Sequence, residues 1–192
     1  MRLMVASINQ SKRIIMKAKL NFTKRILITS AMTLAIWGQV IWDYFHGGIP
    51  THYLLHNPNL PGIPNWVGAL LFPFFVYFLL YRIHKRIDEN YSEAPLQKIL
   101  WRFLGGLLFA VAISVCFVNG IEYTDYILAL VFLLAFIYPL YKSEYYLGWV
   151  LGAAFTFGAF IPMVFGGIFC LLLFLINRFV NFIKRVLKPK SI

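Results

Sequence analysis

Apolar residues of this chain gather into runs close to the length that crosses a lipid bilayer. Such runs cover residues 26–42, 63–81, 99–118 and 126–141. An α-helix rises about 1.5 Å per residue, so roughly 20 apolar residues cross a hydrocarbon core about 30 Å thick. Each run is therefore predicted to form one membrane-spanning helix.

The last apolar stretch, residues 145–183, is too long for a single crossing. It contains Pro162 and the pair Gly166 and Gly167 near its middle. Proline and glycine both weaken a continuing helix. We therefore expect a tight hairpin at this point, which divides the stretch into spans over residues 145–162 and 164–183.

The distribution of basic residues decides between six spans and the alternative of five. Lys and Arg are enriched in cytoplasmic loops of membrane proteins. With six spans all 18 basic residues lie on one side, whereas five spans would place the five basic residues of the C-terminal end on the other. The prediction is an all-α, polytopic transmembrane bundle over residues 26–183, with both termini cytoplasmic. A basic cytoplasmic or interfacial segment, residues 1–25, precedes it, and a basic cytoplasmic tail, residues 184–192, follows it.

Composition supports lipid as the solvent of this chain. Sixty per cent of the residues are apolar and only 13% are charged, against about a quarter charged in a typical soluble domain. The net charge of +11 would indicate nucleic acid as the partner of a soluble protein. Here the charge lies at the chain ends and in the loops, so we expect anionic lipid headgroups at the cytoplasmic face, and no nucleic acid, as its partner.

Histidines and acids come together on the face predicted to be exoplasmic. Three of the four histidines and three of the seven acids lie there. His52 and His56 are four residues apart, so a short helix between Pro50 and Pro58 would carry both on one face. Imidazole nitrogens and carboxylate oxygens are ligands of zinc and similar divalent metals. The candidate metal or polar site comprises Asp43, His46, His52, His56, Glu122 and Asp125.

Two interpretations of this cluster stay open. A divalent metal such as zinc could activate water there against a lipid or a small exoplasmic substrate, with Asp43 orienting His46. Polar residues are also ordinary at a headgroup boundary, where the loop would only cap the bundle. No strict motif such as HExxH is present, so the catalytic residues of such an enzyme stay unassigned.

Small residues in the fifth predicted span indicate close helix packing. Gly148, Gly152 and Gly158 lie among alanines at a spacing that allows two helices to approach. Packing within the bundle is the expected role, and a homo-oligomer or another membrane protein is the alternative partner. The span centres contain almost no ionisable residue, which argues against ion pumps and proton-coupled carriers.

Two segments resemble small bacterial membrane proteins whose role is not established. They are FHGGIPTHYLLHNPNLPGIPNWVG at residues 45–68 and YYLGWVLGAAFTFGAFIP at residues 145–162. The resemblance implies a bacterial inner membrane and transfers no activity. The main functional prediction is a non-catalytic membrane module: a subunit, an assembly factor or a small-solute pathway. A metal-dependent, hydrolase-like membrane enzyme and a transporter or channel for a weakly charged solute are the alternatives.

Overall fold

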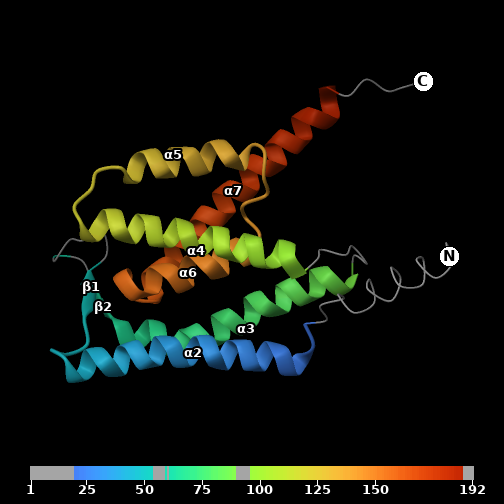
Figure 1. Ribbon diagram of the computed structural model, residues 1–192. Coiled ribbons are helices and arrows are strands. Elements are labelled where there is room, and N and C mark those ends of the chain that lie inside the picture. Colours follow the sequence, from blue (N-terminus) through green and yellow to red (C-terminus); the bar gives the residue numbers. More distant parts are fainter. Residues whose placement is uncertain (1–19, 54–58, 60, 90–95, 188–192) are drawn as a thin grey trace, which may run out of the picture.

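A computed structural model describes residues 20–53, 59, 61–89 and 96–187 of the chain (Figure 1). These residues form six α-helices and one two-stranded sheet. Residues 1–19 of the predicted basic N-terminal segment and residues 188–192 of the predicted C-terminal tail lie outside the described part. The helices are α2 (Phe22–Phe45), α3 (Asn65–Glu89), α4 (Leu96–Val118), α5 (Thr124–Ala135), α6 (Ser143–Phe157) and α7 (Phe160–Leu187).

Four of these helices, α2, α3, α4 and α7, are long and apolar enough to cross a membrane. The prediction of a helical protein is therefore confirmed, with four helices among the described residues that can span a membrane. Helices α5 and α6 are shorter, with 12 and 15 residues, or roughly 18 and 22 Å of helix.

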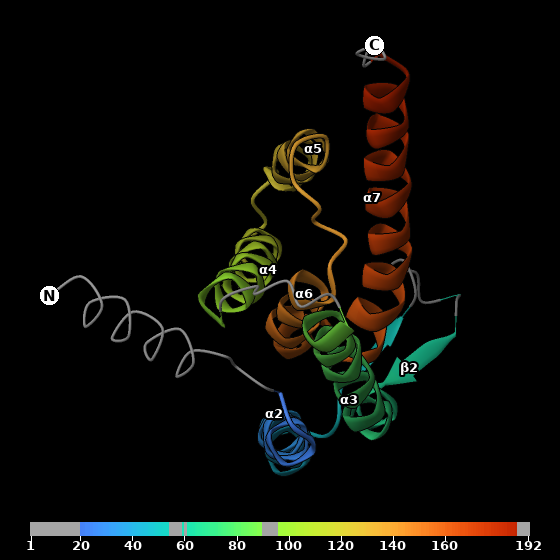
Figure 2. The same cartoon turned by 90° about the vertical axis from the view of Figure 1, so that its right-hand side faces the viewer.

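Successive helices reverse direction, so that α2 begins and α7 ends at the same end of the bundle (Figure 1). We call this the basic end, because Arg86, Arg102 and Lys142 lie there. The opposite end carries the strands β1 (Thr51–Tyr53) and β2 (Gly62–Pro64) and is called the sheet end. Figure 2 looks along most of the helices and shows α7 inclined across them, with its C-terminal part projecting from the bundle.

Helices α4 and α6 make the closest contact in the bundle. A Cβ atom added at Gly148 would meet the backbone oxygen of Phe103, and one added at Gly152 would lie 2.7 Å from the Cβ of Ala110. Glycine therefore allows the two backbones to touch here. Gly158 lies outside this contact: it follows α6, has φ +68°, and packs against the amide of Asn65.

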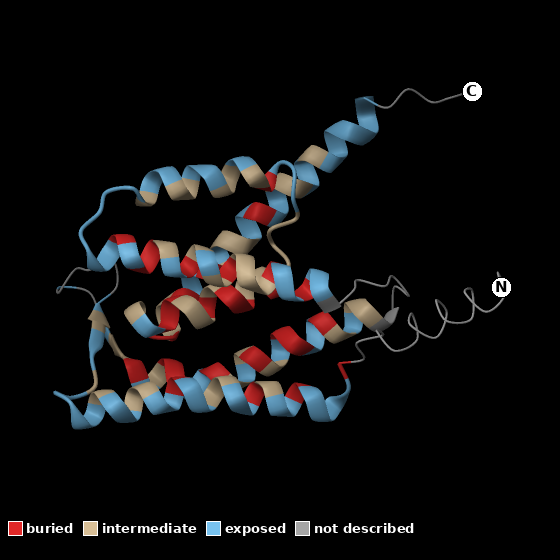
Figure 3. Ribbon diagram, in the orientation of Figure 1, coloured by how far each residue is buried: buried red, intermediate tan, exposed pale blue. Residues whose placement is uncertain are grey.

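Helices α2 and α3 form a second layer that packs against α6. Phe72 and Val76 of α3 are fully buried between the layers. Trp37 Nε1 donates a hydrogen bond to the carbonyl oxygen of Ala69 at 2.9 Å, and Gln39 Nε2 donates to that of Phe155 at 3.2 Å. Figure 3 shows buried residues on the facing sides of these helices. Mid-helix apolar side chains such as Leu34, Phe74, Leu108 and Leu133 are instead more than half exposed, as expected of a surface that faces lipid.

The fourth predicted span, residues 126–141, is helical only to Ala135. Residues 136–142 form turns instead. Pro139 explains the early end, because proline has no N–H to donate and disfavours helical geometry at the residue before it.

The reversal between the last two helices also differs from the prediction. The chain turns at Gly158 and Ala159, whereas Pro162, Gly166 and Gly167 all lie inside α7. The positive φ of Gly158 is a conformation that glycine adopts without strain. Pro162 is tolerated because it occupies the first turn of α7, where a backbone N–H has no helical partner.

The loop after α2 is extended where a short helix was expected. Thr51, His52 and Tyr53 form β1, which pairs antiparallel with Gly62–Pro64, and His52 lies opposite Ile63. The prolines at the second strand fix extended backbone angles, which favours pairing over helix formation. The expectation of a helix starting at Pro50 is therefore wrong over residues 51–53, and residues 54–58 lie outside the described part.

Candidate functional site

The predicted exoplasmic cluster is spread across the sheet end. The ring of His46 stacks on Trp42 with centroids 3.8 Å apart, and its Nδ1 lies 2.9 Å from the carbonyl oxygen of Trp42. Oδ2 of Asp43 is buried and has no hydrogen-bond partner among the described residues. Asp43 lies in the last turn of α2 and His46 is the C-cap that follows it, so this pair is local to one helix end.

His52 lies apart from that pair, in the wall of a cavity of about 300 Å³. Thr124 and Trp149 are among the residues that line the same cavity. Glu122 and Asp125 are exposed. Over residues 20–53, 59, 61–89 and 96–187, no three His, Cys, Asp or Glu side chains are grouped so that they could hold a metal. His56 lies outside these ranges, so the metal site stays a prediction.

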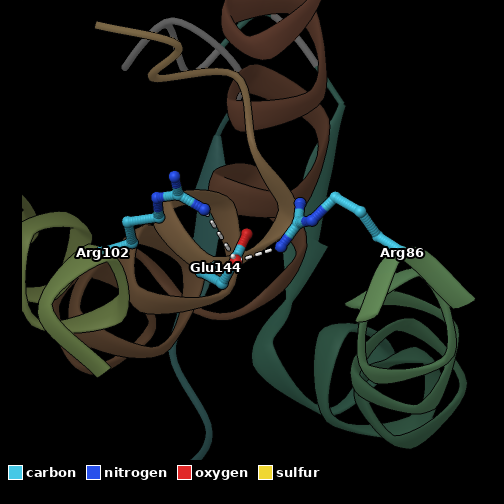
Figure 4. A network of polar contacts seen from close by, with 3 residues as sticks. All are labelled: Arg86, Arg102 and Glu144. Carbon is cyan, nitrogen blue, oxygen red and sulfur yellow. Dashed lines mark hydrogen bonds and ion pairs between the residues drawn. The ribbon is translucent and has the colours of Figure 1, made fainter. Parts of the chain in front are cut away.

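The structure instead brings a different set of charges together at the basic end. Glu144, in the first turn of α6, is fully buried. Its Oε1 pairs with Arg86 of α3 and with Arg102 of α4, the latter at 3.5 Å (Figure 4). The two arginines reach the carboxylate from opposite sides, so this one acid joins three helices.

Around this ion-pair network, cations outnumber acids among the side chains that the structure describes. Lys142 lies two residues before Glu144 in the chain. Burial lowers the pKa of Lys142, and the nearby guanidinium groups of Arg102 and Arg86 lower it further. Lys98 also contributes to this repulsion. Among the side chains that the structure describes, Arg86 and Arg102 contact the Glu144 carboxylate, and Lys142 and Lys98 add two further cations nearby. The N-terminus of α6 adds the positive end of a helix dipole. The set of five residues is called the cationic cluster below.

A cavity of about 520 Å³ begins beside the cationic cluster and runs between α4, α5, α6 and α7. Tyr145, which lies beside Arg102, is in its wall. Its remaining lining is mostly apolar. Leu108, Leu130 and Tyr138 line it and are each more than half exposed, so the cavity opens sideways to the surface between α4 and α5.

Two of the polar groups in this cavity are already engaged within the protein. The hydroxyl of Tyr146 donates to the carbonyl oxygen of Met163, and Trp149 Nε1 donates to that of Pro162 at 3.2 Å. These bonds hold α6 against the first turn of α7. The cavity therefore offers an occupant apolar surface along its length. Arg102 and Lys142 are not in its wall, but they lie close in the chain to lining residues at one end, Gly105 and Leu140.

No family model, curated protein or solved structure matches this chain. The proposed function therefore rests on the geometry of the cavity and of the cationic cluster.

Proposed function

We propose that the protein is a non-catalytic membrane module that holds the apolar part of a lipid-like molecule between α4, α5, α6 and α7. The observation that carries the proposal is the cavity of about 520 Å³ with its sideways opening at Leu108 and Leu130. Its volume lies within the range of about 300 to 1,000 Å³ that is usual for small-molecule sites. A molecule already dissolved in the bilayer can enter such an opening without crossing water.

The proposal includes six crossings of a bacterial inner membrane, with the basic end at the cytoplasmic face. The alternating directions of the six helices support an even number of crossings (Figure 1). Described lysines and arginines lie toward the basic end, whereas the loops of the sheet end carry none.

Filling the cavity tests the proposal. Leu134→Trp places a larger side chain in the wall of the cavity, so we expect it to exclude the occupant. The measurement is labelling by a phospholipid with a photoreactive group in its acyl chain, mapped by peptide mass spectrometry. We expect wild-type protein to be labelled at cavity residues on α5 and α7, and the variant to lose most of that labelling.

The neighbouring residue provides a matched control. Leu133 belongs to the same helix but points outward and is 66% exposed. Leu133→Trp should therefore leave labelling of the cavity residues unchanged. Wild-type labelling confined to outward-facing residues, or equal labelling of both variants at the cavity, would refute the proposal.

A pathway for a weakly charged solute is the second candidate function. Trp149 lines both the larger cavity and the smaller one that contains His52, so the two cavities meet at one side chain. Together they extend from the basic end toward the sheet end. Labels on Phe157 and Phe165, in the wall of the smaller cavity, would favour such a pathway over a closed lipid site.

A further inference from the structure

We infer that the occupant of the larger cavity is one acyl chain of an anionic phospholipid, whose headgroup is held by Lys142 and Arg102 of the cationic cluster. The inference rests on the proposed function and adds the chemistry of the headgroup. It starts from the position of the charges: Arg102 lies one turn before Gly105 and Gly106, which line the cavity. On the other side, Leu140 lines the cavity just before Lys142.

The excess of positive charge in the cationic cluster favours binding of an anion at this end of the cavity. Among the described side chains, the cationic cluster contains four cations and one acid, Glu144, which contacts two of those cations. Lys142 makes no ion pair with another described residue, and burial and the nearby guanidinium groups lower its pKa. A phosphodiester with net negative charge beside Lys142 would offset both the burial and the repulsion.

Glu144 has a positioning role in this arrangement. Because Nη1 of Arg102 donates to Oε1 of Glu144 and the guanidinium also makes a side-chain hydrogen bond to Tyr145, its orientation is fixed. A guanidinium carries five N–H donors, so it can also donate to a phosphate beside Tyr145. The phenols of Tyr138 and Tyr145, both in the cavity wall, can donate to the same phosphate. An acyl chain attached to that phosphate would extend along the apolar wall toward Trp149.

An anionic phospholipid fits better than a zwitterionic one, because a choline group would bring another positive charge to the cluster. It also fits better than an apolar protein segment, which would leave the cluster without an anion. The sideways opening admits a chain from the bilayer, so the headgroup stays at the membrane surface while the chain enters. The structure thus matches both parts of one amphiphile.

Labelling with two photoreactive lipids tests this inference on the full-length protein. Phosphatidylglycerol and phosphatidylcholine carrying the same acyl-chain probe are each added at low mole fraction to phosphatidylcholine vesicles that contain the protein. We expect phosphatidylglycerol to label cavity residues more strongly. Lys142→Gln should reduce that preference roughly fivefold, the effect expected of one lysine facing an anionic lipid, and Lys142→Arg should retain it.

Lys24→Gln is the matched control, because it removes one exposed positive charge from the same end of the bundle but from α2, which does not line the cavity. It should leave the preference unchanged. Equal labelling of wild type by both lipids would overturn the headgroup assignment while the proposed function stands. Absence of cavity labelling by either lipid would overturn the proposed function itself.

Discussion

Glu144→Gln is expected to destabilise the protein by about 3 kcal/mol, the lower end of the range for breaking a buried ion pair. The substitution keeps the shape of the side chain but removes the charge that Arg86 and Arg102 share. Arg102 would remain almost buried without a counter-ion, whereas Arg86 is partly exposed and can turn toward water. Thermal unfolding in detergent should therefore shift downward by roughly 10 °C.

Two further variants separate lost charge from general damage. Glu122→Gln removes an exposed carboxylate at the sheet end and should leave the unfolding temperature within about 1 °C, because isolated exposed charges contribute little. The double variant Glu144→Gln with Arg102→Gln should recover part of the loss, since fewer unpaired charges remain buried. An unfolding temperature unaffected by Glu144→Gln would contradict the role of the ion-pair network.

Gly148→Ala should also weaken the bundle, by about 1 to 3 kcal/mol, as other overpacked sites do. The added methyl group would meet the backbone oxygen of Phe103 and would lie 2.7 Å from the backbone nitrogen of Leu107. Backbone atoms of a helix cannot rotate away, so α4 and α6 must separate. We expect a lower unfolding temperature and greater protease sensitivity in the detergent-solubilised variant.

Gly38→Ala is the comparison for this substitution. Gly38 is a mid-helix glycine of α2, and a Cβ atom there has nothing within 4 Å. Alanine should be neutral or stabilising by up to about 1 kcal/mol, because it forms helix more readily than glycine. If both glycine variants unfold alike, the close approach of α4 and α6 is not what Gly148 provides.

The helix positions could be predicted from the sequence, because a helix surrounded by lipid must be apolar over the whole length that crosses it. Residues 26–42 and 99–118 fall within α2 and α4, where few glycines or prolines compete with the pattern. The points at which one helix ends and the next begins were harder to predict. Pro162 suggested a hairpin, but a proline in the first turn of a helix is compatible with it, and the left-handed conformation of Gly158 marks the turn.

The candidate sites could be predicted from the sequence less well than the helices, for a different reason. His52 and His56 suggested a shared helical face, yet strand pairing depends on residues 62–64, which no local spacing identifies. Glu144 had a usable signal, because it is an acid at the edge of an apolar run with basic residues near the ends of neighbouring spans. Its convergence with Arg86 and Arg102 depends on which helices pack together, and hydrophobic periodicity does not specify that.

The orientation of the bundle in the membrane is the measurement that tests the account most directly. In intact cells, a C-terminal reporter that is active only in the cytoplasm should be active, and Asn119→Cys in the exposed turn after α4 should react with a membrane-impermeant thiol reagent. That result would place the basic end at the cytoplasmic leaflet. An inactive C-terminal reporter, with Asn119→Cys shielded from the outside, would place the cationic cluster at the cell exterior and contradict the account.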